Sequence, residues 1–255
     1  MIFKIIDTEK VEKLFGNWQE TLIWSCIQKI MGSIYADDLQ NPKSAMAIIG
    51  DFNFFAGKPC KELVLYKPKE YKQDFIIMVP QNEGWVKLIG ESYGDKAKKV
   101  TCYAIKKEEN IFDINRLETI VDSLAPPYSI KMIDEDIFYY CKLNNWSRDL
   151  VSQYSDYEIY KKLGLGVVII KAGIPVSGAS SYTRYKEGIE IEIDTKEEYR
   201  RKGLAYACGA KLILECLNRK LYPSWDAHNK WSAVLAEKLG YHYDHDYIAF
   251  EIWGY

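Results

Sequence analysis

The sequence predicts a mixed α/β (α+β) fold, a twisted mixed sheet flanked by helices. Two observations predict it. Short apolar or β-branched runs alternate with segments of helical periodicity, and positions 189–227 have the order strand, helix, strand, a crossover that requires parallel strands. With 255 residues, 48% of them hydrophobic and 27% charged, the chain is long enough for two globular domains.

Residues 1–125 are predicted to form the smaller, N-terminal α/β domain. Apolar residues at three-and-four spacing predict an opening helix over 8–30. Runs bounded by Gly, Pro, Asn and Lys predict strands at 44–55, 63–66, 75–79 and 100–105, and helical patterns cover 83–93 and 113–124.

Pro126 and Pro127 set the predicted domain boundary, because proline cannot continue a helix and disfavours helix at the residue before it. In residues 126–255 the same patterns predict strands at 128–132, 166–171, 176–185, 189–193, 221–227 and 247–252. They predict helices at 136–143, 146–163 with breaks, 202–220 and 229–239.

A short repeat connects the two halves of the chain. The segments GWVKLIGESYG (84–94) and KWSAVLAEKLG (230–240) share a Trp, a Glu and a Gly at the same spacings. If the repeat is genuine, the N-terminal domain is a diverged copy of the C-terminal one; three matches in such a window also arise by chance.

Charge and cysteine content exclude several classes of protein. The chain carries 34 Lys and Arg against 36 Asp and Glu, divided evenly about Pro126, so no nucleic-acid partner is expected. No apolar run reaches 18 residues, the start is too short for a signal peptide, and no membrane partner is expected. Six cysteines without a Cys-x-x-Cys pair favour the reducing cytoplasm.

The helix expected from about residue 202 begins with an unusual concentration of positive charge. Arg200, Arg201 and Lys202 precede Gly203, although the helix dipole disfavours basic residues at this end. An anion bound to the free N–H groups explains them, since Gly203 lets it approach the backbone and Ala205 keeps the next turn narrow. A solvated basic turn with an ordinary glycine is the alternative.

The surrounding motifs favour the anion site. Arg200-x-x-Gly203-x-Ala205 follows a strand, IEIEIDT, and precedes YPSWDAHNKWSAVLAEKLGY. Together they resemble the GNAT superfamily of N-acetyltransferases, whose signature R/Q-x-x-G-x-G/A wraps the pyrophosphate of acetyl-coenzyme A. The resemblance covers residues 128–255. It is greatest to the two-part bacterial GNAT acetyltransferases, a group that includes a self-resistance enzyme against zwittermicin.

This resemblance implies a GNAT-like, acetyl-CoA-binding catalytic domain over 126–255, with acetyl-CoA as co-substrate and no metal. It implies that strands 189–193 and 221–227 splay apart, and that backbone groups of Ile193 and Thr195 bind the pantetheine arm. Asn229 would touch the arm from the other side, or would serve only as a helix N-cap. The phosphates would be held by Arg200, Arg201, Lys202, Gly203, Leu204 and Ala205.

Acyl transfer to an amine needs a base, and two carboxylates are candidates. Glu190 and Glu192 alternate with isoleucines, so they point to the same side of the strand. A free Glu is a weak base for an ammonium group, so a raised pKa or a water relay would be required. The alternative is a solvent-facing strand surface. A backbone N–H, that of Ile193, is expected to meet the developing oxyanion.

The residue that protonates the leaving thiolate departs from the superfamily pattern. Many members carry a Tyr where this sequence has Ala236. Ser232, Tyr241 or solvent are the substitutes, because a thiolate with a pKa near about 8.5 is a tolerable leaving group.

Two further groups of residues stand out in the C-terminal half of the sequence. Trp225 and Asp226, at the end of a strand, are predicted to border the acceptor site, where Asp226 would attract a cationic amine or only fix the turn. His242 and His245 are expected to lie in a polar hairpin, because no third ligand stands at a recognisable spacing.

The function expected from these features is transfer of an acetyl group from acetyl-CoA to a primary amine of a small molecule, with residues 1–125 shaping the acceptor pocket. The alternative, motivated by Ala236, is a catalytically inactive CoA-binding or interaction protein. Neither the acceptor nor the oligomeric state follows from the sequence.

Overall fold

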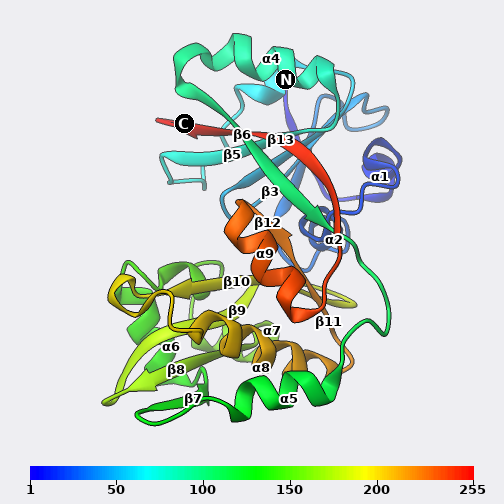
Figure 1. Cartoon of the computed structure of the whole chain (residues 1–255). Helices are drawn as coiled ribbons and strands as arrows, with labels where there is room; N and C mark the ends of the chain where they lie inside the picture. The colour runs from blue at the N-terminus through cyan, green and yellow to red at the C-terminus, as the bar shows by residue number, and fades with distance from the viewer. The chain divides into compact units, whose positions relative to one another are not determined.

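The computed structural model describes all of residues 1–255, which form two compact units (Figure 1). The first unit comprises 1–102 and 246–255, and the second comprises 103–245. The chain passes between them inside the strands β6 (Ala97–Ile105) and β13 (Tyr243–Trp253). These units differ from the domains predicted around Pro126, because Leu117 of the preceding helix is buried in the core of the second unit.

The first unit is a mixed sheet with helices. Its strands are β1 (Phe3–Ile5), β2 (Ser33–Ala36), β3 (Ser44–Ile49), β4 (Phe52–Gly57), β5 (Phe75–Pro80), β6 and β13, and the sheet follows the order β1-β2-β3-β4-β5-β13-β6. Its helices are α1 (Glu9–Phe15), α2 (Thr21–Ile27), α3 (Lys61–Val64), α4 (Glu83–Tyr93) and the 3₁₀ turn η1 (Gly94–Lys96). Strands β4 and β5 pair in parallel, whereas β1 with β2, β2 with β3, β3 with β4, and β5 with β13 pair antiparallel.

Three sequence predictions for this unit are corrected by the structure. The helix over 8–30 is two helices, because Gly16 ends α1 with a φ of 59°. The strand over 44–55 is a hairpin, since Gly50 turns the chain at a φ of 55°. Residues 63–66 were predicted as a strand, but Leu63 and Val64 are buried from helix α3, as a short apolar run fits either periodicity.

The second unit is built on a five-stranded sheet of order β11-β10-β9-β8-β7. Its strands are β7 (Tyr128–Met132), β8 (Gly166–Lys171), β9 (Ile174–Tyr185), β10 (Gly188–Thr195) and β11 (Tyr222–Ser224), with β12 (Asp226–Ala227) outside this sheet. Its helices are α5 (Ile114–Asp122), α6 (Glu135–Leu143), α7 (Tyr157–Leu163), α8 (Leu204–Asn218) and α9 (Lys230–Leu239), with 3₁₀ turns η2 (Arg148–Leu150) and η3 (Glu197–Tyr199).

The crossover predicted over 189–227 is confirmed. Strands β10 and β11 pair in parallel and are joined by α8. The helix predicted over 202–220 is α8, and its buried stripe includes Leu204, Cys208, Leu212 and Cys216, four residues apart. The single strand predicted over 221–227 is corrected: it divides at Trp225, and β12 pairs antiparallel with the end of β6 at Tyr103 and Ala104.

Both units present their elements in the same order. In the first, one strand and two helices precede three consecutive strands, a helix, a parallel strand and another helix, from β1 to α4. The second repeats this order from β7 to α9, with η2 inserted before α7, η3 before α8 and β12 before α9. The repeated segments 84–94 and 230–240 therefore fall on corresponding helices, α4 and α9.

Candidate functional site

The parallel strands β10 and β11 separate part-way along their length. Their pairing runs from Gly188 and Tyr222 to Glu190 and Ser224. Beyond it β10 continues to Thr195, still paired with β9, whereas β11 has ended. Pro223 suits such an edge strand because it has no N–H to donate to a ladder. The separation predicted for these strands is present.

A cavity of about 760 Å³ opens where the strands separate. One wall is the second half of β10, and the opposite wall is the segment from Trp225 to the first turns of α9. It is lined by Ile191, Glu192, Ile193, Asp194, Thr195, Arg200, Arg201, Ala205, Trp225, Asp226, His228, Asn229, Trp231, Ser232 and Leu235. Most residues predicted for the site are thus brought together, while their roles remain predictions.

The loop between β10 and α8 has the backbone geometry of an anion site. Arg201 has a φ of 61° and Gly203 a φ of 76°, and no side chain caps the N-terminus of α8. A Cβ added to Gly203 would meet no atom within 4 Å, so the space above this glycine is open. The first N–H groups of a helix lack intrahelical partners, and positive-φ turns direct such groups together.

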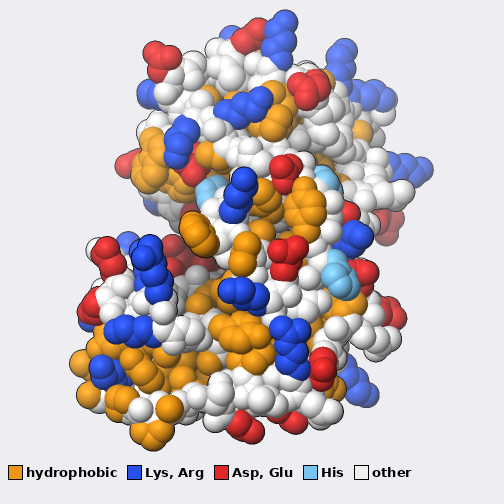
Figure 2. Space-filling view, viewed as in Figure 1, with side chains coloured by type: hydrophobic (Ala, Val, Ile, Leu, Met, Phe, Trp, Pro, Cys, Tyr) orange, Lys and Arg blue, Asp and Glu red, His pale blue; other side chains and the backbone are white.

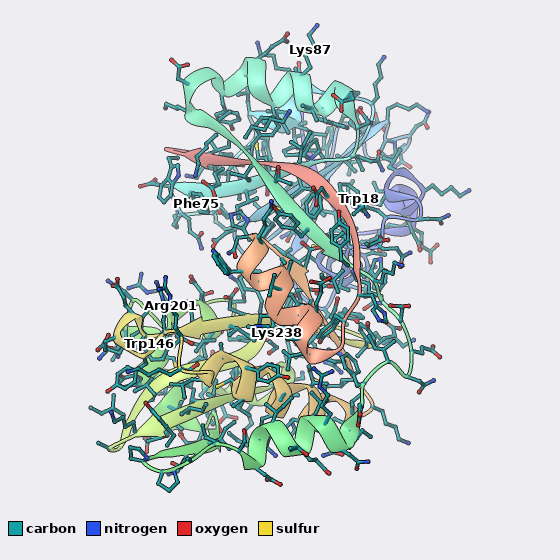
Figure 3. The ribbon with its side chains drawn as sticks, in the orientation of Figure 1. Trp18, Phe75, Lys87, Trp146, Arg201 and Lys238 are labelled. Carbon is teal, nitrogen blue, oxygen red and sulfur yellow. The ribbon has the colours of Figure 1, made fainter.

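A second cavity of about 440 Å³ lies over this loop and includes Gly203, Leu204, Ala205 and Lys238 in its lining. Basic side chains gather over the loop in the space-filling view (Figure 2), and Figure 3 shows Arg201 on the loop and Lys238 on α9. Lys202 lines neither cavity: its ammonium group donates to the Glu198 carbonyl and lies 4.9 Å from the centre of the Tyr199 ring.

The first turn of α9 forms the opposite wall of the larger cavity. Asn229 caps this helix by accepting a hydrogen bond from the Ser232 N–H at 3.0 Å, which confirms the predicted N-cap. The Ser232 hydroxyl accepts a hydrogen bond from the Trp225 indole N–H at 3.0 Å. The Tyr241 hydroxyl donates to the Pro223 carbonyl at 2.5 Å and does not line the cavity.

The carboxylates of β10 divide into two groups. Glu190 is only 4% exposed and does not line the cavity, whereas Glu192 and Asp194 line it. Burial raises the pKa of the Asp194 carboxyl to about 7; the Asp149 carboxylate also raises it, and the Arg200 guanidinium opposes this. A group with such a pKa exchanges protons near neutral pH.

Sequence reasoning assigned no site role to five residues of the cavity, which are Ile191, Asp194, His228, Trp231 and Leu235. Asp194 continues the alternation of Glu190 and Glu192, so following the pattern two residues further would have identified it. Trp231 is 85% exposed although it lies at the cavity, and in the sequence it was marked only as the Trp of the repeated segment 230–240. No pattern in the sequence assigned a role to His228.

The remaining histidines lie outside the cavity. His242 contacts Glu108 at 2.7 Å, and His245 contacts Asp244 at 2.9 Å, each through Nδ1. Residues 243–253 form β13, so His245 lies in a long strand rather than in the predicted hairpin. No group of three His, Cys, Asp or Glu residues is placed to hold a metal ion. None of the helices combines the length and apolar character needed to cross a bilayer.

Comparisons with known proteins agree with this architecture. A crystal structure of a GCN5-related N-acetyltransferase-like protein from Streptococcus suis 89/1591 is 50% identical, with a TM-score of 0.91, covering 97% of this chain and 98% of that one. The uncharacterized N-acetyltransferase YdfB of Bacillus subtilis (strain 168) is 26% identical over 238 residues, covering 87% of this chain and 86% of the relative.

A similarity of fold alone extends to a tandem GNAT protein from the clavulanic acid biosynthesis pathway. That structure is 8% identical, has a TM-score of 0.50, and covers 100% of this chain and 99% of its own. The sequence model of the GNAT acetyltransferase family matches residues 12–250, which span both units. With this match over nearly the whole chain, the protein belongs to the GNAT acetyltransferase family.

Proposed function

We propose that this protein transfers the acetyl group of acetyl-CoA to a primary amine of a small molecule. The observation that carries the proposal is one continuous feature: the gap between β10 and β11 leads to the uncapped, basic N-terminus of α8. A donor with a diphosphate at one end and a thioester at the other fits such a site, because one end needs N–H donors and the other a narrow, partly apolar cleft.

The proposed placement of acetyl-CoA uses the residues at each end. The diphosphate lies at the N–H groups of residues 201–205, and the pantetheine arm follows the backbone of Ile193 and Thr195. Asn229 uses its carbonyl oxygen to cap α9, which leaves its amide N–H₂ to contact the arm. The thioester then lies where β10 and β11 separate.

The amine must lose a proton before it attacks the thioester. Of the two predicted bases, Glu192 lines the cavity and Glu190 does not, so we favour Glu192 for direct contact with the amine. Asp194 joins it as a candidate because its pKa of about 7 suits proton acceptance at neutral pH. An acidic wall would also attract a cationic acceptor.

Thiol release from acetyl-CoA tests the proposal. Purified protein is mixed with acetyl-CoA and a panel of polyamines, amino sugars and amino acid amides, and each amine is paired with its N-acetylated form as control. We expect thiol release only with free amines, together with an acetylated product identified by mass spectrometry. Release without any amine product would contradict the proposed reaction.

A second candidate is a protein that binds CoA without turnover. It is favoured by Ala236, which is fully buried at the position where many relatives carry a tyrosine. Calorimetric binding of acetyl-CoA without turnover of any amine would support this candidate. Absence of acetyl-CoA binding would reject both candidates together.

The identity of the base is tested separately. Glu192→Gln, Asp194→Asn and Glu190→Gln are compared by their pH–rate profiles, with Glu197→Gln, an exposed carboxylate outside the cavity, as control. Loss of the acidic limb of the profile in one variant identifies the base. Profiles like that of the unmodified protein in all three would exclude these carboxylates.

A further inference from the structure

The pair formed by Trp225 and Ser232 has a geometry that the proposed reaction leaves unexplained. The Trp225 ring is 3% exposed, and its indole N–H donates to the Ser232 hydroxyl oxygen at 3.0 Å. An indole N–H is a donor only, so the direction of this hydrogen bond is fixed. Because β11 has ended at Ser224, Trp225 stands at the point where the strands separate.

The direction of this bond determines where the Ser232 hydroxyl proton can go. The hydroxyl oxygen is the acceptor for Trp225, and the Ser232 backbone N–H is held by Asn229. No protein atom accepts the hydroxyl proton, while Ser232 lines the cavity. The proton is therefore available to an acceptor inside the cavity.

The Trp225 indole is itself held in place. Its ring packs against Tyr241 with centroids 5.6 Å apart and an angle of 68°, and Tyr241 packs edge-on against Phe112 at 4.9 Å. The Tyr241 hydroxyl is engaged with the Pro223 carbonyl. Tyr241 thus supports the indole and has no hydroxyl proton to offer the cavity, which removes it from the candidates for thiolate stabilisation.

We propose that the Ser232 hydroxyl donates a hydrogen bond to the sulfur of coenzyme A as the thiolate departs, and that Trp225 positions this hydroxyl. The inference rests on the proposed function. Ile191 and Ser232 line the larger cavity but not the cavity over Gly203, so with the diphosphate at residues 201–205 the proposal places the thioester beside them.

The reaction balances with serine remaining protonated. The ammonium group gives one proton to a β10 carboxylate, and the free amine nitrogen forms a bond with the acetyl carbon. The carbon–sulfur bond breaks with its electron pair on sulfur, and the nitrogen releases its second proton to solvent, which leaves a neutral amide. The Ser232 O–H stabilises that charge by a charge-assisted hydrogen bond, and solvent later protonates the thiolate. The indole N–H donating to the same oxygen polarises the O–H bond and strengthens it as a donor.

Binding of CoA and desulfo-CoA tests this role without turnover. Affinities of both are measured by calorimetry at pH 7 and pH 9.5. In the unmodified protein we expect CoA to gain about fivefold over desulfo-CoA at the higher pH, because the site favours thiolate. Ser232→Ala and Trp225→Phe should lose most of this gain, and Ser232→Thr, which keeps a hydroxyl, should retain it.

Kinetics provide a second readout. Trp225→Phe should lower kcat about tenfold while the KM for acetyl-CoA changes less than twofold, since the hydrogen bond acts mainly when charge develops on sulfur. Trp253→Phe, at an exposed tryptophan outside the cavity, is the matched control.

The possible outcomes are distinguishable. A pH-dependent preference for CoA that persists in Ser232→Ala, or that is absent from the unmodified protein, overturns the inference. Unmodified protein that binds neither CoA nor desulfo-CoA overturns the proposed function instead. Desulfo-CoA binding in each variant shows that its site is folded.

Discussion

Helices α4 and α9 occupy corresponding places in the two units, yet their N-termini differ. Each begins after an asparagine N-cap, Asn82 or Asn229, and each is followed by a glycine with positive φ. In the first unit a Cβ on Gly84 would lie 2.7 Å from Pro59, so the start of α4 is closely covered. The start of α9 lines the larger cavity.

The strands beside these helices differ in the same way. Strands β4 and β5 pair from Phe52 to Phe55, and the contact continues as the Gln81 N–H donates to the Phe55 carbonyl. The Gln81 side chain accepts from the Gly57 N–H, and the Trp85 indole donates to the Gly57 carbonyl. The space that is open between β10 and β11 is thus filled in the first unit.

The segments that follow β4 and β10 differ in length and charge, and this difference accounts for side chains occupying the space beside the strands in the first unit only. After β4 the chain has a single Lys58 before the four-residue helix α3. After β10 it has Arg200, Arg201, Lys202 and Gly203 before the 15-residue helix α8. The same order of elements is therefore followed by a basic loop and a long uncapped helix in the second unit only, where the anion site is proposed. We infer that one acetyl-CoA binds per chain, in the second unit.

The largest effect on free energy is expected from removing the Trp85 side chain, which helps to fill the space beside β4 and β5 in the first unit. Trp85 is fully buried, 5.2 Å from the Phe55 ring, so Trp85→Ala should lower the free energy of unfolding by about 3–5 kcal/mol. Urea denaturation measures this loss. Calorimetry at low temperature should still give one acetyl-CoA per chain; a second bound molecule would mean that filling alone prevents binding in the first unit.

Removing the anion site of the second unit should have the next largest effect. Gly203→Glu places a carboxylate where the diphosphate is proposed to lie, and should weaken acetyl-CoA binding at least about 100-fold, or about 2.7 kcal/mol. Gly173→Glu is the matched control, since Gly173 has a φ of 81° and also has open space above it, in a turn outside both cavities. Equal affinities in the two variants would exclude the phosphate site.

A bulky side chain placed in the larger cavity of the second unit tests whether filled space alone weakens acetyl-CoA binding. Leu235 lines both cavities, and Leu235→Trp should imitate the filled first unit and weaken acetyl-CoA binding about tenfold, or about 1.4 kcal/mol. Val234→Trp places the same ring on the neighbouring, exposed position of α9, which lines neither cavity. If both variants bind acetyl-CoA like the unmodified protein, the donor does not occupy the space beside Leu235.

The parts of the fold and of the candidate site that could be predicted from the sequence are those that local patterns determine. The stripe of α8 and the parallel pairing of β10 with β11 follow from periodicity and from the crossover rule, both of which act within a short stretch of chain. The division of the predicted strand 221–227 at Trp225 could not be predicted from such patterns, because it depends on the pairing of β12 with Ala104, over a hundred residues away. Trp225 and Ser232 are only seven residues apart, yet their contact depends on how the chain turns between β11 and α9, which no local pattern shows. The influence of Asp149 on Asp194 likewise joins two separate segments of the chain.

The smallest effect is a pH-dependent change in stability at Asp194. Its pKa is raised from an ordinary 3.8 to about 7, so the folded protein binds a proton more tightly than the unfolded chain. The cost of charging Asp194 in the folded state is absent below pH 4, grows as the pH rises towards 7, and is complete above it. Asp194→Asn carries no charge, so it should match the unmodified protein at pH 4 and exceed it at pH 8. We expect about 1 kcal/mol, because the side chain keeps some solvent contact. Urea denaturation midpoints at both pH values measure the difference, and Asp95→Asn, at an exposed position, is the control. If Asp194→Asn is less stable than the unmodified protein at pH 8, the cavity wall stabilises the Asp194 carboxylate instead of disfavouring its charge.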